Sequence, residues 1–595
     1  MHEPYKTGIT VFLGGKETMK RKNVGFLTGA ALALIIALGA ARTQAAALQP
    51  TADTGTASSA DSPEQIILAA LPQATPQGQS AQQAISLPLH GVPQAVFEAL
   101  KAQAAAGSIG KEGSTQQSPL GNAPSAPQAG GVLTPFISVG FAGAKQGCAG
   151  GGSFAPSDMG LAVNQTFVLQ AVNSCVSVFD KTGVLQAGFP KTLDAFMGQS
   201  ATTFIFDPRA LYDWVNNRFI VTATHCRSCE TGSNVSVLDI AVSQTSDPRG
   251  GWNVYHLNVQ SAFTLPLGAF ADFPRVGQDR RAIYVSFNEF SFPSGNFIQT
   301  FVVYLSKANM YAGAALGSFN FNFNFSGGGG EFDSIQPANI MNKADNPRAN
   351  FMVNSENIEF GRGACSTGCD NLVVWSVANP IGPVANLKVL GVFVTTANTF
   401  SLPPQATQPG AVLVDTNDVR ISGEVTYASG SLFGSLNTNG TGSGAGESHI
   451  LWFQLRPFLN DTPDITGVQI LNEDCYFCSG QGSGATGSTF YGTLQPDPEG
   501  NVMMVFSYSD DATNVESAYV SRRVTQAQNT MHDSGIVLQS GLAAYADGRW
   551  GDYNGTAPDL TNPISSSMWV AADSAKTAHV WRSAIGNVHF KVTDP

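Results

Sequence analysis

Aspartate and arginine residues recur just before short apolar runs along most of this 595-residue chain. Carboxylates beside arginines can perform acid–base chemistry, bind a carboxylated sugar through paired hydrogen bonds, or hold Ca²⁺. Alternatively, the aspartates in Asp-Pro and Asp-Asn turns only cap their own backbone amides. The candidates for a ligand-binding site are Asp207, Arg209, Asp272, Arg275, Asp333, Asp415, Arg420, Arg549 and Asp552.

The turns that carry these residues belong to a loose internal repeat. Its anchors are Asp158, Asp207, Asp272, Asp333, Asp415, Pro496 and Asp552. Successive anchors lie 49 to 82 residues apart, and each precedes an apolar strand pattern. A period of about 40–70 residues with several short strands is typical of β-propeller blades. We therefore expect an all-β fold in which residues 135–595 form a single β-propeller. Seven blades fit the anchors, and the spread of spacings leaves six or eight open.

A propeller would bring the nine candidates together, because the first strand of each blade lines a central channel. The last strand, near His579–Trp581 or Val588–Lys591, would close the ring by pairing with N-terminal strand material. A mouth of mixed charge would suit a polar or anionic ligand, or Ca²⁺ as the one cofactor considered.

Catalytic signatures are absent from the sequence: it has no Gly-x-Ser-x-Gly, His-Glu-x-x-His, Walker or Rossmann motif. This absence favours a protein that binds a glycan or a surface protein at its channel mouth or rim. The alternative is a carbohydrate-active hydrolase or lyase that uses the channel Asp and Arg residues. The sequence leaves open whether the protein is an enzyme.

The N-terminus has the pattern of a secretory signal peptide at residues 19–47. A basic segment, Met19–Lys22, precedes the apolar run Phe26–Ala41 and the small residues around Ala45. Residues 1–18 would then precede the true start. The mature protein is expected to be secreted, periplasmic or at the cell surface, without a membrane-inserted segment.

Residues 48–134 differ in composition, being dominated by Ala, Gln, Pro, Ser and Gly. We expect a low-complexity linker or pro-segment, in which Pro93–Ala106 is either a short docking helix or a transient one. The formal net charge of −12 argues against nucleic acid and against anionic membranes as partners.

An alternation of Phe and Asn at residues 319–325 predicts a strand with its Phe rings on one face. The rings could form a platform for a sugar, but packing between blades is the favoured interpretation. No metal is predicted for the cysteines. A zinc site formed by the two CxxC pairs, Cys226/Cys229 with His225 beside it and Cys475/Cys478, is the alternative.

Disulfides are the expected state of the eight cysteines, because an even number in an exported chain favours pairing. Three close pairs stand out, and the two remaining cysteines are left to each other. The expected bridges are Cys226–Cys229, Cys365–Cys369, Cys475–Cys478 and Cys148–Cys175.

Several motifs, in their combined order, resemble a family of uncharacterised exported bacterial proteins with sialidase-like propellers. They are Asp207–Asp213, Arg218–Phe219, Ser243–Trp252, Phe270–Arg275, Tyr284–Phe290, Arg549–Tyr553 and Trp581–Gly586. The resemblance spans roughly residues 154–590 and implies a bacterial, exported propeller, but no established reaction.

Residues Thr245–Trp252 also resemble an Asp-box, the structural turn between the outer strands of sialidase-type blades, with one extra residue of spacing. An Arg-Ile-Pro-type segment before this turn and a Tyr–Glu pair would be needed for sialidase activity. No such segment is found, which counts against that activity.

Overall fold

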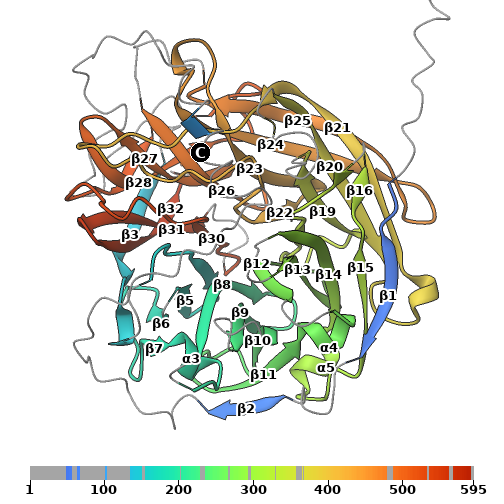
Figure 1. Ribbon diagram of the computed structural model, residues 1–595. Coiled ribbons are helices and arrows are strands. Elements are labelled where there is room, and N and C mark those ends of the chain that lie inside the picture. The colour runs from blue at the N-terminus through green and yellow to red at the C-terminus, as the bar shows by residue number, and fades with distance from the viewer. Residues whose placement is uncertain are drawn as a thin grey trace, which may run out of the picture. The chain divides into compact units, whose positions relative to one another are not determined.

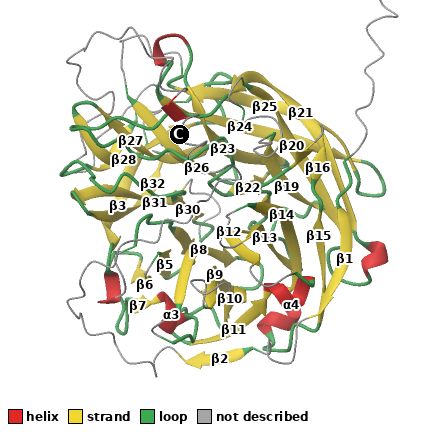
Figure 2. Ribbon diagram, viewed as in Figure 1, coloured by secondary structure: helices red, strands yellow, loops and turns green. Residues whose placement is uncertain are grey.

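The computed structural model describes residues 48–56, 63–67, 101–102, 135–150, 154–173, 175–200, 203–227, 235–265, 269–291, 296–327, 330–356, 365, 368–478, 487–531, 535–561 and 567–590. This part of the chain is nearly all β (Figure 2). The expected signal peptide lies outside it. Among the described residues, no helix is long and apolar enough to cross a membrane.

Most described strands belong to four-stranded antiparallel meanders. The first three are β4 Gly160–Val163, β5 Phe167–Val172, β6 Cys175–Asp180, β7 Lys191–Thr192; β8 Phe204–Asp213, β9 Arg218–Arg227, β10 Val235–Ser243, β11 Gly251–Asn258; and β12 Ala269–Gln278, β13 Ala282–Ser291, β14 Phe297–Ser306, β15 Ser318–Phe323. The next three are β18 Gln336–Asn339, β19 Asn350–Ser355, β20 Cys369–Ala378, β21 Lys388–Phe400; β22 Val425–Ala428, β23 Ser431–Asn439, β24 Ser448–Leu459, β25 Ile465–Tyr476; and β26 Ser488–Pro496, β27 Val502–Asp510, β28 Thr513–Arg522, β29 Ile536–Gln539.

The last meander is composite. It joins β30 Gly555–Pro558, β31 Ser567–Thr577 and β32 Val580–His589 to an early strand, β3 Phe136–Lys145. Strand β3 runs antiparallel to β32, with Phe136 opposite His589 and Lys145 opposite Arg582. The C-terminal strand is thus paired with N-terminal strand material, as the sequence predicts.

The first strands of the meanders, here called the inner strands, contact one another in a closed cycle. The order is β4, β8, β12, β18, β22, β26, β30 and back to β4. Parallel pairs join β12 to β18 and β18 to β22. Figure 1 shows β8, β12, β22, β26 and β30 towards the middle, and β1, β15 and β25 at the periphery. This cyclic arrangement of radial meanders is that of a β-propeller.

Glycine permits the close approach of two inner strands. A Cβ built on Gly277 of β12 would lie 2.6 Å from the Pro337 Cβ and 2.7 Å from the Pro337 carbonyl carbon, on β18. Real Cβ atoms essentially never come this close to another heavy atom. The glycine therefore allows the backbones to pack at this spacing.

Two edge strands come from the region expected to be a linker. Strand β1, Thr51–Thr56, pairs with β15, and β2, Glu64–Ile67, pairs with β11. The sequence did not predict either strand. Each extends the outer edge of one meander and supplies partners for its backbone groups.

The alternating Phe residues lie in the core. Phe319 and Phe321 are 5% exposed and pack with Phe301 and with Phe263 of α4, Val259–Phe263. This packing agrees with the favoured interpretation and not with a sugar platform. The remaining short elements are α3 Leu193–Phe196, α5 Lys307–Tyr311, β16 Ser326–Gly327, β17 Gly330–Glu331 and the 3₁₀ turns Cys148–Gly150, Val384–Asn386 and Gly442–Gly444.

Three of the expected disulfides are present: Cys148–Cys175, Cys365–Cys369 and Cys475–Cys478. The first connects the segment after β3 to the start of β6. Cys229 lies outside the described residues, so the Cys226–Cys229 bridge stays a prediction.

Candidate functional site

The backbone just before several inner strands, or within their first half, shares an unusual conformation. Asp158, Asp207, Phe273, Ser334 and Tyr491 all have positive φ, between 41° and 55°. This left-handed region is uncommon for residues other than glycine, and surrounding structure must hold it. Strands β8, β12 and β26 also carry a pairing irregularity at this point. Such bulges redirect side chains out of the regular ladder.

Asp158 is a hub among the aspartates at these positions. The Asp552 main-chain N–H donates to its Oδ1 at 2.7 Å, and Asn173 Nδ2 donates to its Oδ2 at 2.7 Å. Asp207 lies close enough that its charge adds to burial and to Asp552 in raising the pKa of Asp158. Close carboxyls cannot all ionise easily, so this group of aspartates favours protonation. Asp158 was an anchor of the repeat but not one of the nine site candidates.

Burial shifts these carboxyls towards the protonated form. Burial, reinforced by Asp272 and Asp552, raises the pKa of Asp207 to about 8. Burial also raises the pKa of Asp272 to about 7, and that of Asp333 to about 6 against the lowering effect of Arg420. Near neutral pH this cluster therefore mixes neutral and charged carboxyls.

Three predicted arginines surround one aromatic ring. The guanidinium carbons of Arg275, Arg420 and Arg209 lie 4.2, 5.0 and 5.5 Å from the centre of the Phe273 ring. All three side chains are at most 2% exposed. Burial and the two neighbouring arginines lower the pKa of Arg275. Cation–π contacts to a desolvated ring offset part of the cost of this crowding.

Some of the predicted residues are already paired within the chain. Arg549 binds both oxygens of Asp552 at 2.6 Å each and contacts Asp415 at 3.3 Å. Arg420 binds Asp418 through Nε at 2.8 Å. The Arg549 and Asp415 side chains are 18% and 16% exposed. They therefore form a solvent-facing edge beside the buried aspartates.

Other buried atoms have no hydrogen-bond partner among the described residues. They are Arg209 Nη2, Arg275 Nε and Nη2, Asp272 Oδ1 and both carboxyl oxygens of Glu289. Buried polar atoms normally have a protein, water or ligand partner, because an unmade hydrogen bond is costly. These donors and acceptors are therefore available to bind a polar group of a ligand.

The structure therefore brings the predicted residues together. The "Asp/Arg centre" below means Asp158, Asp207, Asp272, Asp333, Asp552, Arg209, Arg275 and Arg420, which are linked by hydrogen bonds, electrostatic coupling or shared contact with Phe273. Asp415 and Arg549 border it.

Two buried glutamates were not predicted as part of this site. Glu289 on β13 has a pKa raised well above its usual value by burial and by Asp272. Burial raises the pKa of Glu424 to about 8, and its Oε2 accepts a 3.0 Å hydrogen bond from Asn339. The only signal in the sequence was a carboxyl within a strongly apolar strand pattern around Glu289.

Metal ligation finds no support in this geometry. Across the residues that the structure describes, no group of three or more His, Cys, Asp or Glu side chains is arranged to hold an ion. The centre instead offers neutral carboxyls as donors and guanidinium groups as charged donors. That combination can bind hydroxyls and carboxylates.

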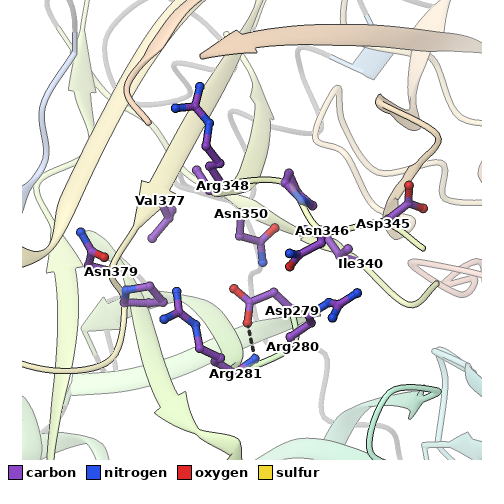
Figure 3. A pocket seen from close by; sticks show the side chains of 13 residues that line it. Asp279, Arg280, Arg281, Ile340, Asp345, Asn346, Arg348, Asn350, Val377 and Asn379 are labelled. Atoms are coloured by element: carbon purple, nitrogen blue, oxygen red, sulfur yellow. Dashed lines mark hydrogen bonds between the residues drawn. The ribbon is translucent and has the colours of Figure 1, made fainter. Parts of the chain in front are cut away.

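A separate surface pocket lies at the opposite ends of the inner strands (Figure 3). Asp279 directly follows β12, and the Asp279 carboxylate accepts a hydrogen bond from the Arg281 main chain at 2.7 Å. Arg280 and Arg348 also line this pocket. It contains none of the nine predicted residues, so it is not the predicted mouth.

Comparison with known proteins finds distant structural likeness only. No family model matches the chain. No curated protein matches it. An exo-β-1,3-galactanase of Phanerochaete chrysosporium is 11% identical with a TM-score of 0.27, over 78% of this chain and 97% of that one. A Trypanosoma rangeli sialidase is 10% identical with a TM-score of 0.31, over 70% and 58%. An ulvan lyase is 12% identical with a TM-score of 0.29, over 70% and 91%. At these values the likeness identifies neither ligand nor reaction for this chain.

Proposed function

We propose that the protein is an exported, seven-bladed, sialidase-like propeller that binds a carboxylate-bearing glycan at its Asp/Arg centre. One observation carries this proposal: buried guanidinium donors of Arg209 and Arg275 have no hydrogen-bond partner in the part of the chain that the structure describes. A planar guanidinium matches the two oxygens of a carboxylate, and aimed donors give specificity. Neutral carboxyls of Asp207 and Asp272 would donate to sugar hydroxyls.

Access to this centre would run past the solvent-facing edge. Arg549 and Asp415 are its partly exposed neighbours, and Arg549 binds Asp552. An incoming carboxylate would meet Arg549 first and exchange part of that ion pair. The net charge of the chain is negative, so a local cluster of guanidinium groups is required for an anionic ligand to bind.

Calorimetry with oligogalacturonate tests the proposal directly. Wild-type protein should bind it, and bind its methyl ester at least tenfold more weakly, because the ester removes the charge that guanidinium recognises. Arg275→Met should abolish binding. Arg348→Met, which removes an exposed arginine of the opposite pocket, is the matched control and should bind normally. Equal binding of acid and ester would overturn the proposal.

Carbohydrate cleavage is the second candidate, favoured by Asp272. Its pKa of about 7 suits proton donation near neutral pH, and its charge helps to raise the pKa of the buried carboxyl of Glu289. Incubation with polygalacturonate should then release reducing ends, with unsaturated products indicating a lyase. Asp272→Asn should stop the release while the fold is retained. Intact polymer with the wild-type protein would exclude cleavage of this substrate.

The Asp-box belongs to the same proposal. Residues Thr245–Trp252 connect β10 to β11, the outer strands of their meander. The Asp247 N–H donates to Thr245 Oγ1 at 3.1 Å, and the Trp252 ring is fully buried. These contacts support a structural turn rather than a ligand site.

Export would be tested by sequencing the N-terminus of the secreted protein, with cleavage near Ala45 expected.

A further inference from the structure

A lysine from the region before the propeller is bound within the propeller. Lys101 is 2% exposed, and three of the residues that contact its ammonium lie more than 300 positions away in the sequence. Its Nζ donates to Pro403 O at 2.7 Å, Thr416 Oγ1 at 2.8 Å and Asn417 O at 2.5 Å. A lysine ammonium has three N–H donors and no acceptor, so three converging oxygens satisfy it fully.

The propeller itself holds these acceptors in place. The Thr416 hydroxyl donates to Pro404 O at 2.8 Å, which directs its lone pairs away from that carbonyl. The Thr416 carbonyl accepts from Asn437 Nδ2 at 2.8 Å. Asn417 adopts φ of 53°, and its N–H donates to Asp415 Oδ1 at 3.0 Å. Thr416 and Asn417, which supply two of the three oxygens, are therefore held by contacts other than those with Lys101.

The same residues connect this position to the Asp/Arg centre. Asn417 Nδ2 donates to Asp552 Oδ1 at 3.3 Å, and Asp415 contacts Arg549. A buried ammonium is costly unless hydrogen-bonded and near negative charge. The three oxygen acceptors supply the hydrogen bonds that such burial requires.

We infer that the propeller carries a binding site for a primary ammonium beside its Asp/Arg centre, and that Lys101 is its intramolecular occupant. Three convergent acceptors fit the compact, tetrahedral ammonium, whereas a guanidinium is a planar fork and a quaternary ammonium has no N–H. A ligand that carries a free amine, such as an amino sugar or a lysine of a partner protein, competes with Lys101 for this site. The inference does not depend on carboxylate binding at Arg209 and Arg275.

Chemical rescue in the full-length protein tests the site. Lys101→Ala should lower the melting temperature by about 2 °C because the three acceptors lose their donor. Millimolar n-butylammonium should restore it saturably, while tetramethylammonium and sodium at equal ionic strength should not. Wild-type protein should respond to none of them. Lys343→Ala removes an exposed lysine and is the matched control, with no loss and no rescue.

A second variant separates the ammonium from the packing of the side chain. Lys101→Met keeps the apolar stem but removes the ammonium. The readout is hydrogen exchange of the Asn417 main-chain amide, and butylammonium should slow this exchange with the same selectivity. If both variants behave like Lys343→Ala, or if tetramethylammonium rescues as well as butylammonium, the inference is overturned. A failure of oligogalacturonate binding leaves these readouts unaffected, so the two proposals fail separately.

Discussion

The guanidinium carbon of Arg209 lies 3.1 Å from the centre of the Tyr553 ring. Arg209 belongs to the second meander, and Tyr553 directly precedes the last one. The Tyr553 hydroxyl also donates to Pro208 O at 3.1 Å, so the tyrosine contacts both the side chain and the backbone of this turn. This pair joins two inner-strand starts that are separated by most of the chain and fixes the position of a proposed ligand-binding arginine.

Substitutions at Tyr553 should separate these two contacts. Tyr553→Phe keeps the ring and loses one hydrogen bond, which should lower the free energy of unfolding by about 1 kcal/mol. Tyr553→Leu removes the ring face as well, which should raise the loss to about 3 kcal/mol because the cation–π contact is desolvated. Urea unfolding followed by tryptophan fluorescence measures both. Equal losses would show that the ring face contributes nothing.

Gly277→Ala should be strongly destabilising because the new Cβ would collide with backbone atoms of Pro337 on the neighbouring inner strand. A loss of about 2–3 kcal/mol is expected for overpacking of this kind. Gly467→Ala is the matched control, since a Cβ at that position meets nothing within 4 Å. Denaturant midpoints of the two variants should differ clearly; similar midpoints would mean that the inner strands are free to move apart.

The raised pKa of Asp207 makes stability depend on pH. In the folded protein its pKa is about 8, whereas in the unfolded chain it is near the ordinary value of 3.8. The folded state therefore holds a proton that the unfolded state releases, and this contribution falls as pH rises from about 4 to about 8. Relative to Asp207→Asn, the wild type should lose melting temperature across that window and level off above it. A difference in melting temperature between the two proteins that stays constant from pH 4 to pH 9 would contradict the raised pKa of Asp207.

Two of the disulfides should differ in their effect on stability. The Cys148–Cys175 bridge spans 27 residues, and Cys365–Cys369 spans 4. Loop-closure entropy predicts about 3.5 kcal/mol for the first and about 2 kcal/mol for the second when each pair is replaced by alanine. Chemical unfolding of the two double variants measures the losses. The reverse order would show that contacts of the cysteines outweigh the entropy of the unfolded chain.

The regular part of the fold could be predicted because each anchor combines a turn residue with a following apolar strand. Asp207 and Asp272 lie in the first half of β8 and β12, and Asp333 lies just before β18. Asp415 shows the limit of this reasoning, since β22 begins at Val425 after an irregular segment. Strands β1 and β2 were missed because sequences such as Thr51–Thr56 have no apolar alternation. Their pairing rests on backbone hydrogen bonds to an edge that only the folded meander provides.

The clustering of these Asp and Arg residues was predicted better than their pairing, and their role as a ligand site stays a prediction. Spacing in the sequence indicates that Asp272 and Asp552 precede equivalent strands, but not that Arg549 is bound to Asp552 while Arg275 keeps unused donors. Lys101 could not be assigned, because its acceptors are two backbone carbonyls and one hydroxyl. Backbone carbonyls carry no sequence signature, so a site built from them is visible only in three dimensions.

The pairing of β3 with β32 places Ser138 against Asn587, 449 residues away, with their side chains hydrogen-bonded at 2.8 Å. A ribosome makes the first of these strands near the beginning and the second near the end of synthesis. The edge of β3 therefore stays unpaired until β32 has been made. The entropic cost of closing so long a loop falls on one late step of folding. A message truncated before β32 therefore encodes an unclosed ring with two unpaired strand edges, which are sites of aggregation, and not a smaller functional protein.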